Sequence, residues 1–329
     1  MVTPGAGLRA LADALGERAT LMHPLGPLTT YGVGGPAGLF VEIDGPEDLE
    51  PVRAALRDGA DGAAVFVIGR GSNLLVSDAG FDGIVVHLGS GFAGLELPRS
   101  GGGEPTVRAG AALVLPVLAR RVADAGWSGL AWAVGVPGSV GGAVRMNAGG
   151  HGSDMAACLT RYRWVDLTGS GGGSGDVETL DYGYRRSSVT ATQLVLEAEL
   201  RVTPGSPDAE QEAVAAIVRW RRAHQPGGSN AGSVFTNPED DSAGRLVEAA
   251  RLKGFVIGTA HVSEKHANFI QAERGGRADD VYAVMEHVRA VVAERCGVML
   301  RTEVRLLGFG GGETGGVSDP DHRPGAELR

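Results

Sequence analysis

Cysteine and lysine are scarce in this chain of 329 residues. The two cysteines, Cys158 and Cys296, cannot form a disulfide framework, so we expect a reducing compartment, the cytoplasm. Lysine occurs only at Lys253 and Lys265, which leaves arginine to supply the rest of the 30 basic residues. Acidic residues outnumber basic ones and give a net charge of −9. This balance opposes binding to nucleic acid or to an anionic membrane through bulk charge.

Long hydrophobic runs are also missing. One uncharged stretch, residues 125–144, is long enough to span a bilayer, but it contains six glycines and Pro137. Each glycine costs about 1 kcal/mol in a helix and proline about 3 kcal/mol, so the stretch is predicted to be a loop-rich part of a soluble protein. The N-terminal residues carry a charge every few positions, and we expect no targeting segment there.

Glycine is abundant, with 54 residues, yet 43% of the chain is hydrophobic and can bury a core. Short apolar runs alternate with helical patterns in the first 205 residues. Strands are predicted at 39–43, 64–68, 84–88, 160–166 and 193–203, and helices at 46–59 and 113–125. After a composition change near residue 205, helices are predicted at 209–222 and 278–296, and strands at 255–262, 267–271 and 298–307. Residues 310–329 are predicted to be a disordered tail.

One glycine cluster, residues 32–37, matches the dinucleotide-binding pattern G-x-G-x-x-A in sequence but not in its predicted structural context. A dinucleotide loop follows a strand and opens a helix, whereas this cluster precedes the predicted strand at 39–43. We therefore reject dinucleotide binding there. Neither lysine follows a phosphate-binding loop of the Walker A type, and we predict no metal site.

Two further glycine loops carry polar donors. The first, residues 69–78, has the sequence GRGSNLLVSD and directly follows a predicted strand. The second, residues 135–149, has the sequence GVPGSVGGAVRMNAG. Successive N–H groups on such turns can form anion-binding nests, although one such loop alone is more often a tight structural turn. Two of them in one domain favour a cofactor that contains a diphosphate.

With TTYGVGGP at 29–36 upstream, these loops resemble the UDP-N-acetylenolpyruvoylglucosamine reductase (MurB) family. Later segments agree in order: YRRS at 184–187, AGSVFTNP at 231–238, VSEKHANFI at 262–270 and EVR at 303–305. The resemblance extends from about residue 25 to 308. It departs from the family at His224 and Thr236, where the family more often has lysine, and these changes put in doubt how tightly anionic ligands are held.

The resemblance implies an α+β fold. It implies an FAD-binding domain of the p-cresol methylhydroxylase (PCMH) and vanillyl-alcohol oxidase type over residues 1–205, with subdomains at about 20–95 and 96–205. A smaller α+β substrate domain over residues 206–309 follows it. The implied reaction is the NADPH-dependent, FAD-mediated reduction of UDP-N-acetylglucosamine enolpyruvate to UDP-N-acetylmuramate in peptidoglycan precursor synthesis. The implied ligands are FAD, NADPH and a UDP-sugar, and a monomer is the default state.

Three catalytic residues follow from the resemblance. Arg185 would face the negative charge that develops on the substrate carboxylate. Ser233 would donate the proton, for which its weakly acidic hydroxyl needs a polarising environment. Glu303 would position the substrate carboxylate or the Arg185 head group. Read without the family, Arg185 is an ordinary surface residue, Ser233 lies in a turn, and Glu303 fits the alternation of a strand.

The resemblance and the two loops also indicate binding residues. The expected cofactor-binding residues are Gly69, Arg70, Gly71, Ser72, Asn73, Leu74, Ser77, Gly135, Pro137, Gly138, Ser139, Gly142, Ala143, Arg145 and Asn147. The expected substrate-binding residues are Tyr184, His224, Asn237, Lys265 and His266. Two other functions stay open at this point: an FAD-linked sugar or alcohol oxidase on the same scaffold, and a non-catalytic module that binds a nucleotide sugar.

Overall fold

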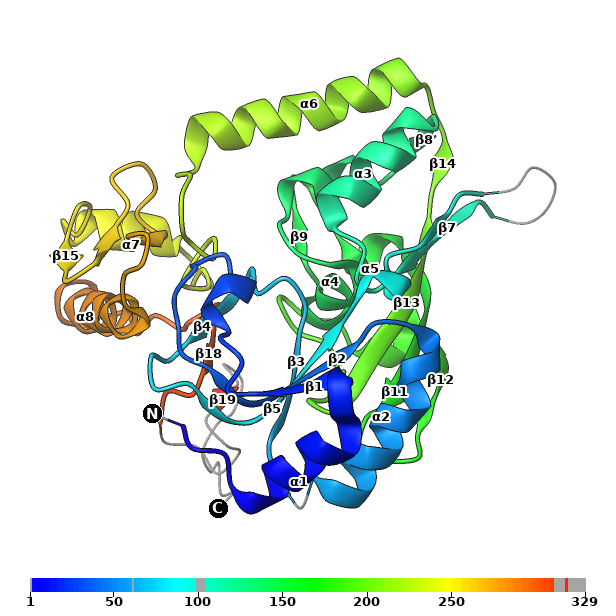
Figure 1. Cartoon of the computed structure of the whole chain (residues 1–329). Helices are drawn as coiled ribbons and strands as arrows, with labels where there is room; N and C mark the ends of the chain where they lie inside the picture. The colour runs from blue at the N-terminus through cyan, green and yellow to red at the C-terminus, as the bar shows by residue number, and fades with distance from the viewer. Residues whose placement is uncertain (1, 61, 99–103, 311–316, 319–329) are drawn as a thin grey trace, which may run out of the picture.

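The computed structural model describes residues 2–60, 62–98, 104–310 and 317–318. It begins with a mixed sheet in the order β1-β2-β5-β3, in which β2, β5 and β3 are parallel and β1 is antiparallel to β2. Two helices, α1 and α2, contact each other and strand β2, and Figure 1 shows both at the lower end of the molecule. The bounds are α1 Ala6–Leu15, β1 Ala19–Leu21, β2 Ala37–Ile43, α2 Pro46–Gly59, β3 Val65–Ile68 and β5 Phe81–Leu88.

A second, five-stranded antiparallel sheet follows in the order β12-β11-β13-β7-β6. In strand β11, Tyr162 is buried between the exposed Arg161 and Arg163, because successive side chains point to opposite faces. Leu159 is buried as well, because the register shifts between Leu159 and Arg161. The apolar face packs into the same core as the first sheet. The bounds are β6 Leu95–Glu96, β7 Thr106–Gly110, α3 Leu115–Asp124, η4 Ala131–Gly135, α4 Val140–Met146, α5 Met155–Cys158, β11 Leu159–Asp166, β12 Gly172–Asp176 and β13 Gln193–Arg201.

The C-terminal part forms a separate core around α7, α8 and a three-stranded sheet. Figure 1 shows α7 and α8 to the left of the two sheets, with the long helix α6 crossing above. Helix α6 packs on α3 and η4 of the preceding part. The bounds are α6 Pro207–His224, α7 Ala243–Ala249, β15 Val256–Ile257, β16 Ala260–Val262, β17 Ile270–Ala272 and α8 Ala278–Cys296.

One strand connects the two parts. Strand β18, Arg305–Leu307, pairs in parallel with β4, Leu74–Val76, which directly follows the first glycine loop. Strand β19, Val317–Ser318, pairs with the other edge of β18. Residues 305–307 thus lie beside the strand that follows the loop at 69–73. The remaining short elements are η1 Gly16–Arg18, η2 Gly26–Leu28, β8 Trp127–Ser128, η3 Ser90–Phe92, β9 Gly149–Gly150, β10 Ser153–Asp154, η5 Val177–Leu180 and β14 Thr203–Pro204.

The predicted α+β class is confirmed, and most predicted elements are present within a few residues. The strand predicted at 298–307 is reduced to β18, and that at 255–262 is a hairpin of β15 and β16. Helix α4 lies inside the second glycine loop and was not predicted. The domain limits near 205 stay a prediction, and most of the predicted tail, residues 311–316 and 319–329, lies outside the described residues. No helix in the described ranges is long and apolar enough to cross a membrane.

Candidate active site

The largest concentration of predicted site residues lies around one cavity of about 280 Å³ between the two parts of the chain. Arg185, Ser233 and Glu303 all line it. So do thirteen of the fifteen residues predicted for the cofactor, all except Ser77 and Asn147. A second cavity of about 300 Å³ shares Gly69, Arg70, Ser139, Gly142 and Arg145 with the first. The two cavities are therefore adjacent and share walls formed by the glycine loops.

The first loop owes its shape to the protein around it. Gly71 has φ +54°, and a Cβ there would lie 2.3 Å from the Leu28 carbonyl oxygen, so only glycine fits. Within the described ranges, the N–H groups of residues 70–73 donate to no backbone or side-chain acceptor, although the Gly71 carbonyl accepts from Thr30. These donors line the cavity and are available to an anion.

The second loop is fastened to the first and begins helix α4. The Ser72 hydroxyl donates to the Pro137 carbonyl at 3.0 Å, which joins the loops directly. In contrast to the first loop, two N–H groups here already have partners: Val140 donates to the Leu113 carbonyl and Gly141 to the Ala111 carbonyl. This loop therefore contributes shape and side chains to the cavity wall more than free amides at its helix start.

Arg185 and Glu303 form an ion pair that spans the two parts of the chain. Arg185 Nε lies 2.7 Å from Glu303 Oε1, and the other guanidinium nitrogens donate to the carbonyls of Gly149 at 3.0 Å and Asn147 at 3.5 Å. Arg185 also has φ +56°, an uncommon backbone conformation for a residue with a side chain. Such local strain clusters at functional sites, where the surrounding structure enforces it.

The environment of Glu303 disfavours its charged form. Its side chain is only 12% exposed, and this burial raises the pKa of Glu303, although the neighbouring Arg185 offsets part of the shift. Glu303 is also held by its backbone, since its N–H donates to the Val234 carbonyl at 2.7 Å and its carbonyl accepts from Asn73 at 3.1 Å. These bonds attach Glu303 both to the first glycine loop and to the segment that carries Ser233.

Ser233 is positioned by the residue that follows it and by a buried asparagine. The Val234 N–H donates to the Asn268 carbonyl, and the Asn268 side chain exchanges hydrogen bonds with both backbone groups of Phe235. Asn268 is only 4% exposed, so this clamp is shielded from water. Among the described residues, the Ser233 hydroxyl itself has no partner and can reach a ligand in the cavity.

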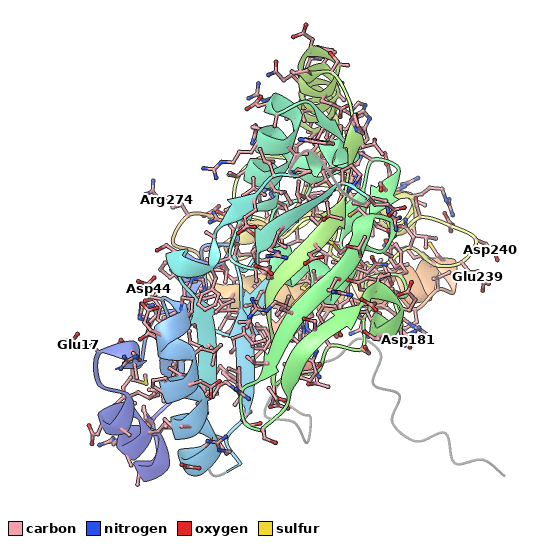
Figure 2. All side chains as sticks on the ribbon, turned by 90° about the vertical axis from the view of Figure 1, so that its right-hand side faces the viewer. Glu17, Asp44, Asp181, Glu239, Asp240 and Arg274 are labelled. Atoms are coloured by element: carbon pink, nitrogen blue, oxygen red, sulfur yellow. The ribbon has the colours of Figure 1, made fainter. Side chains whose placement is uncertain are left out.

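The cavity is strongly cationic although the chain as a whole is acidic. Among the described residues, its walls hold one acid, Glu303, and five arginines: Arg70, Arg145, Arg185, Arg221 and Arg305. Figure 2 shows the acidic side chains of Asp181, Glu239 and Asp240 pointing outward at the edge of the molecule. Arg305 also has a buried Nε without a partner among the described residues. Clustered cations and an unsatisfied donor fit a ligand that carries several negative charges.

The remaining predicted residues have other contacts. The Ser77 hydroxyl accepts from the Ala79 N–H, and the Asn147 side chain bonds to Gly183 and Ala156. The Asn237 side chain accepts from the Ala243 N–H at the start of α7. None of these three lines the cavity in the described structure.

The other substrate-binding predictions lie at the end of α6 or outside the cavity. Lys265 Nζ donates to the Arg222 carbonyl at 2.5 Å. His224 stacks on Trp220, and burial lowers the pKa of His266. Tyr184 is 64% exposed, and its ring lies 5.0 Å from the Arg185 guanidinium carbon.

Several cavity residues were missed. Arg221 and Gln225 line the wall beside the predicted His224, and Arg305 ends the quoted motif EVR. The signal was present for Arg305, because alternation along the strand places residues 303 and 305 on one side. Phe269 lies in the quoted motif VSEKHANFI, whereas Asn230 precedes the motif AGSVFTNP and had no comparable signal. No group of three or more potential metal ligands occurs in the described ranges.

Comparisons with known proteins point to one family. Residues 224–307 match the family model described as "UDP-N-acetylenolpyruvoylglucosamine reductase, C-terminal domain", and residues 43–171 match "FAD binding domain". A UDP-N-acetylenolpyruvoylglucosamine reductase from Heliobacterium modesticaldum is 40% identical over 309 residues, covering 92% of this chain and 95% of that protein. One from Chloroflexus aggregans is 38% identical, with coverage of 87% and 96%. The crystal structure of this reductase from Thermus caldophilus superposes with a TM-score of 0.73 at 32% identity, covering 88% of this chain and 98% of that one.

Proposed function

The chain belongs to the UDP-N-acetylenolpyruvoylglucosamine reductase family of flavin-binding oxidoreductases, and we propose from this premise that it reduces UDP-N-acetylglucosamine enolpyruvate to UDP-N-acetylmuramate. The proposed electron source is NADPH, and the proposed role is peptidoglycan precursor synthesis in the cytoplasm, which supplies cell-wall growth and division. The observation that carries the proposal is the convergence of Arg185, Ser233 and Glu303 on one cationic cavity.

The residues of the two loops fit FAD. The elongated shape of a dinucleotide matches two cavities that share a wall, and its diphosphate matches the free N–H groups at 70–73 and the neighbouring arginines. We therefore assign FAD to the loops at 69–74 and 135–145. When bound, FAD supplies the redox chemistry, taking two electrons from NADPH and passing them to the carbon–carbon double bond of the substrate.

Arg185 is the proposed electrostatic partner of the substrate carboxylate. Reduction of the enolpyruvyl group at its methylene carbon builds negative charge that delocalises into this carboxylate. A fixed cation stabilises that charge most when it needs no reorganisation during the reaction. Arg185 meets this requirement because Glu303 and the carbonyls of Asn147 and Gly149 hold its guanidinium from several sides.

Ser233 is the proposed proton donor. Its hydroxyl faces the same cavity as Arg185 and has no competing partner among the described residues, so it can donate to the carbon that develops negative charge. A serine hydroxyl is a weak acid, and the five arginines around the cavity lower the energy of the alkoxide that it leaves. Glu303 orients Arg185 and, through its N–H bond to Val234, fixes the segment next to Ser233.

The nucleotide parts of the UDP-sugar and NADPH are proposed to approach from the end of α6. Arg221 lines the cavity there, and Lys265 lies next to it through its bond to the Arg222 carbonyl. Tyr184, His224, Asn237 and His266 remain proposed substrate-binding residues, although they do not line either cavity in the described structure. The oxidase alternative is tested by precipitating the protein. The first cavity has no histidine or cysteine in its described wall to tether a flavin, but His87 lines the second. Flavin that stays with the pellet would support an oxidase.

The experiment that tests the proposal separates the two half-reactions of Ser233→Ala. Purified protein is mixed anaerobically with NADPH and then with the enolpyruvyl substrate while the flavin absorbance is followed. Bleaching by NADPH needs no proton from Ser233 and should keep its normal rate. Recovery with the substrate should slow by about 10²–10⁴-fold, the usual contribution of general acid catalysis.

The control is Thr236→Ala in the same segment. The Thr236 hydroxyl bonds to the Arg301 carbonyl and does not line the cavity, so both half-reactions should stay normal. Normal recovery in Ser233→Ala would remove this serine from the mechanism. A wild-type protein that bleaches with NADPH but never recovers with the substrate would refute the proposed function itself.

A further inference from the structure

Helix α8 begins with a residue that cannot cap it. The N-cap position is Arg277, which has extended backbone angles of φ −117° and ψ 135° and no capping side chain of its own. Asparagine, aspartate and serine are favoured at this position because their oxygens accept from the free N–H groups of the first turn. An arginine has no acceptor, and its charge has the same sign as the helix N-terminus. The first turn of α8 therefore needs a partner from elsewhere.

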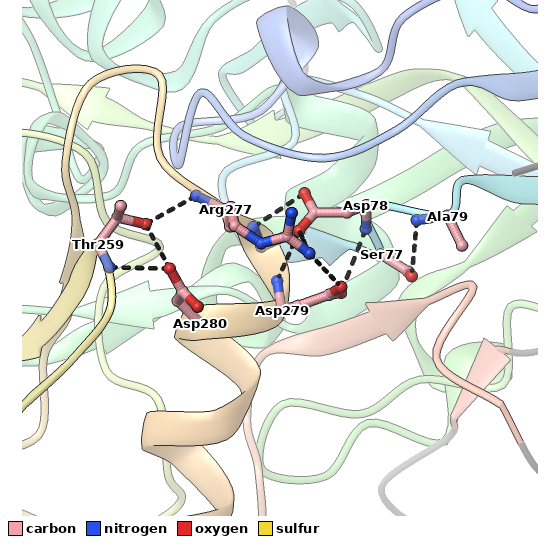
Figure 3. A network of polar contacts seen from close by, with 8 residues as sticks. Ser77, Asp78, Ala79, Thr259, Arg277, Asp279 and Asp280 are labelled. Carbon is pink, nitrogen blue, oxygen red and sulfur yellow. Dashed lines mark hydrogen bonds and ion pairs between the residues drawn. The ribbon is translucent and has the colours of Figure 1, made fainter.

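Asp78 supplies the missing cap from a distant part of the chain. Its two carboxylate oxygens accept the N–H groups of Ala278 at 3.0 Å and Asp279 at 3.1 Å. The contact is reciprocal, because the Asp78 N–H donates to the Asp279 side chain at 3.4 Å. Arg277 Nη2 lies 3.5 Å from the same carboxylate, so its charge is paired as well. Figure 3 shows this network between the turn at 77–79 and the start of α8.

The opposite side of the same turn is attached to the C-terminal part itself. Asp280 accepts from both the N–H and the hydroxyl of Thr259 at 2.8 Å, and the Thr259 hydroxyl accepts from the Arg277 N–H. Thr259 lies between strands β15 and β16, which pack on α8. The first turn of α8 thus joins the C-terminal part to the turn that follows β4.

This junction is connected to the cavity from both sides. On one side, Asp78 comes two residues after β4, the strand that directly follows the first glycine loop. Strand β4 pairs with β18, which begins two residues after Glu303. On the other side, α8 contacts β17, and the Ala272 N–H at the end of β17 donates to the Ser229 carbonyl, four residues before Ser233. A change in the orientation of α8 would therefore move Ser233 relative to the cofactor loops.

We propose that Asp78 is a positioning residue: by capping α8 from the cofactor domain, it fixes the substrate domain so that Ser233 faces the cavity. This inference rests on the proposed function only in assigning a role to Ser233. The competing explanation is that Asp78 merely stabilises the helix. The two explanations differ in what happens when α8 receives a cap of its own.

Arg277→Ser provides that cap, because the backbone at 277 already has the extended angles of an N-cap residue. We compare the wild type with Asp78→Ala, Asp78→Asn, Arg277→Ser and the double variant Asp78→Ala/Arg277→Ser. Amide hydrogen exchange is measured for residues 278–282 and 229–235, and kcat and KM are measured with the enolpyruvyl substrate. Asp78→Asn is the intermediate variant, since asparagine keeps one accepting oxygen while its amide NH2 group cannot accept the second N–H, and the exposed pair with Arg277 contributes little.

In Asp78→Ala, exchange at 278–282 should rise about 2- to 30-fold, which corresponds to the usual stability of an N-cap. In the double variant, this protection should return, while exchange at 229–235 stays faster than in the wild type. Its kcat should remain lower by up to about 10²-fold, the loss expected for a misplacement of about 1 Å, with KM changed less. Asp78→Asn should lie between the wild type and Asp78→Ala in both segments, and Arg277→Ser should behave like the wild type.

Recovery of wild-type exchange at 229–235 and of kcat in the double variant would overturn the proposal and leave Asp78 as a helix cap only. Wild-type exchange at 229–235 in Asp78→Ala would overturn it as well. Because hydrogen exchange needs no substrate, the test still decides the question if the wild type proves inactive. That last result would instead refute the proposed function.

Discussion

Replacing Glu303 by glutamine should separate activity from stability at the centre of the cavity. The variant keeps the size of the side chain and an acceptor oxygen for Arg185 Nε but loses the negative charge. A hydrogen bond to a charged group contributes about 1.5–3 kcal/mol and a neutral one about 0.5–1.5 kcal/mol, so the contact with Arg185 weakens by about 1 kcal/mol. Taken alone, this loss would lower the free energy of unfolding.

Burial of the carboxylate acts in the opposite direction. The pKa of Glu303 is raised above its ordinary value of 4.5, so the native state disfavours the ionised form more than the unfolded state does. For a raised pKa, the stabilising contribution is complete below the unfolded value and is lost as the pH rises through the folded value. Because glutamine does not ionise, the Glu303→Gln variant does not lose this stability as the pH rises. At neutral pH the two effects nearly cancel, and the free energy of unfolding should stay within about 1 kcal/mol of the wild type.

The pH dependence gives the clearest signature. The stability of Glu303→Gln relative to the wild type should increase from pH 4 toward neutrality, following ionisation of Glu303 in the wild type. Turnover should nevertheless fall by about 10²-fold, because Arg185 loses the charged partner that orients it. KM for the anionic substrate should stay the same or fall, since the cavity loses the single acid in its described wall.

Thermal unfolding between pH 4 and pH 8 and steady-state kinetics test this reasoning. Glu248→Gln is a matched control, because it removes the partner of Lys253 at 2.9 Å from a site where Glu248 is 61% exposed. Such an exposed pair contributes little, so the control should change neither quantity. Normal turnover in Glu303→Gln together with a stability loss of more than about 3 kcal/mol, typical of a broken buried pair, would refute the reasoning.

Two further substitutions probe how the site is held. Arg185→Lys should lower kcat by about 10²–10³-fold without loss of bound FAD, because a single ammonium cannot match the planar fork that donates to Glu303, Asn147 and Gly149; activity within threefold of the wild type would contradict this. Gly71→Ala should cost about 1–3 kcal/mol of stability and lower the FAD content of the purified protein, because the backbone is strained there and the Leu28 carbonyl leaves no space. Gly16→Ala, with a similar φ of +59° but open space around it, should keep its FAD content, and equal FAD loss in both variants would show that the clash at Gly71 is unimportant.

Local sequence patterns determined most of the secondary structure. The stripe of apolar residues at 278–296 gave α8 its limits, and the apolar runs at 39–43, 64–68 and 84–88 became β2, β3 and β5. These predictions succeed because the side-chain periods of helices and strands depend on backbone geometry alone. The same reasoning missed α4, because its two glycines and small residues resemble a loop. Packing on β13 and β7 stabilises it despite that composition.

The sequence also indicated many of the residues that line the candidate site, through the glycine loops and the ordered motifs. Tertiary structure alone decided how they meet. Arg185 and Glu303 are separated by more than a hundred residues, and their pairing depends on β4 and β18 lying side by side. The capping of α8 by Asp78 is the same kind of fact, since Arg277 breaks the local rule for a helix start. Local patterns report only on neighbours along the chain, whereas these contacts exist because the two cores dock against each other.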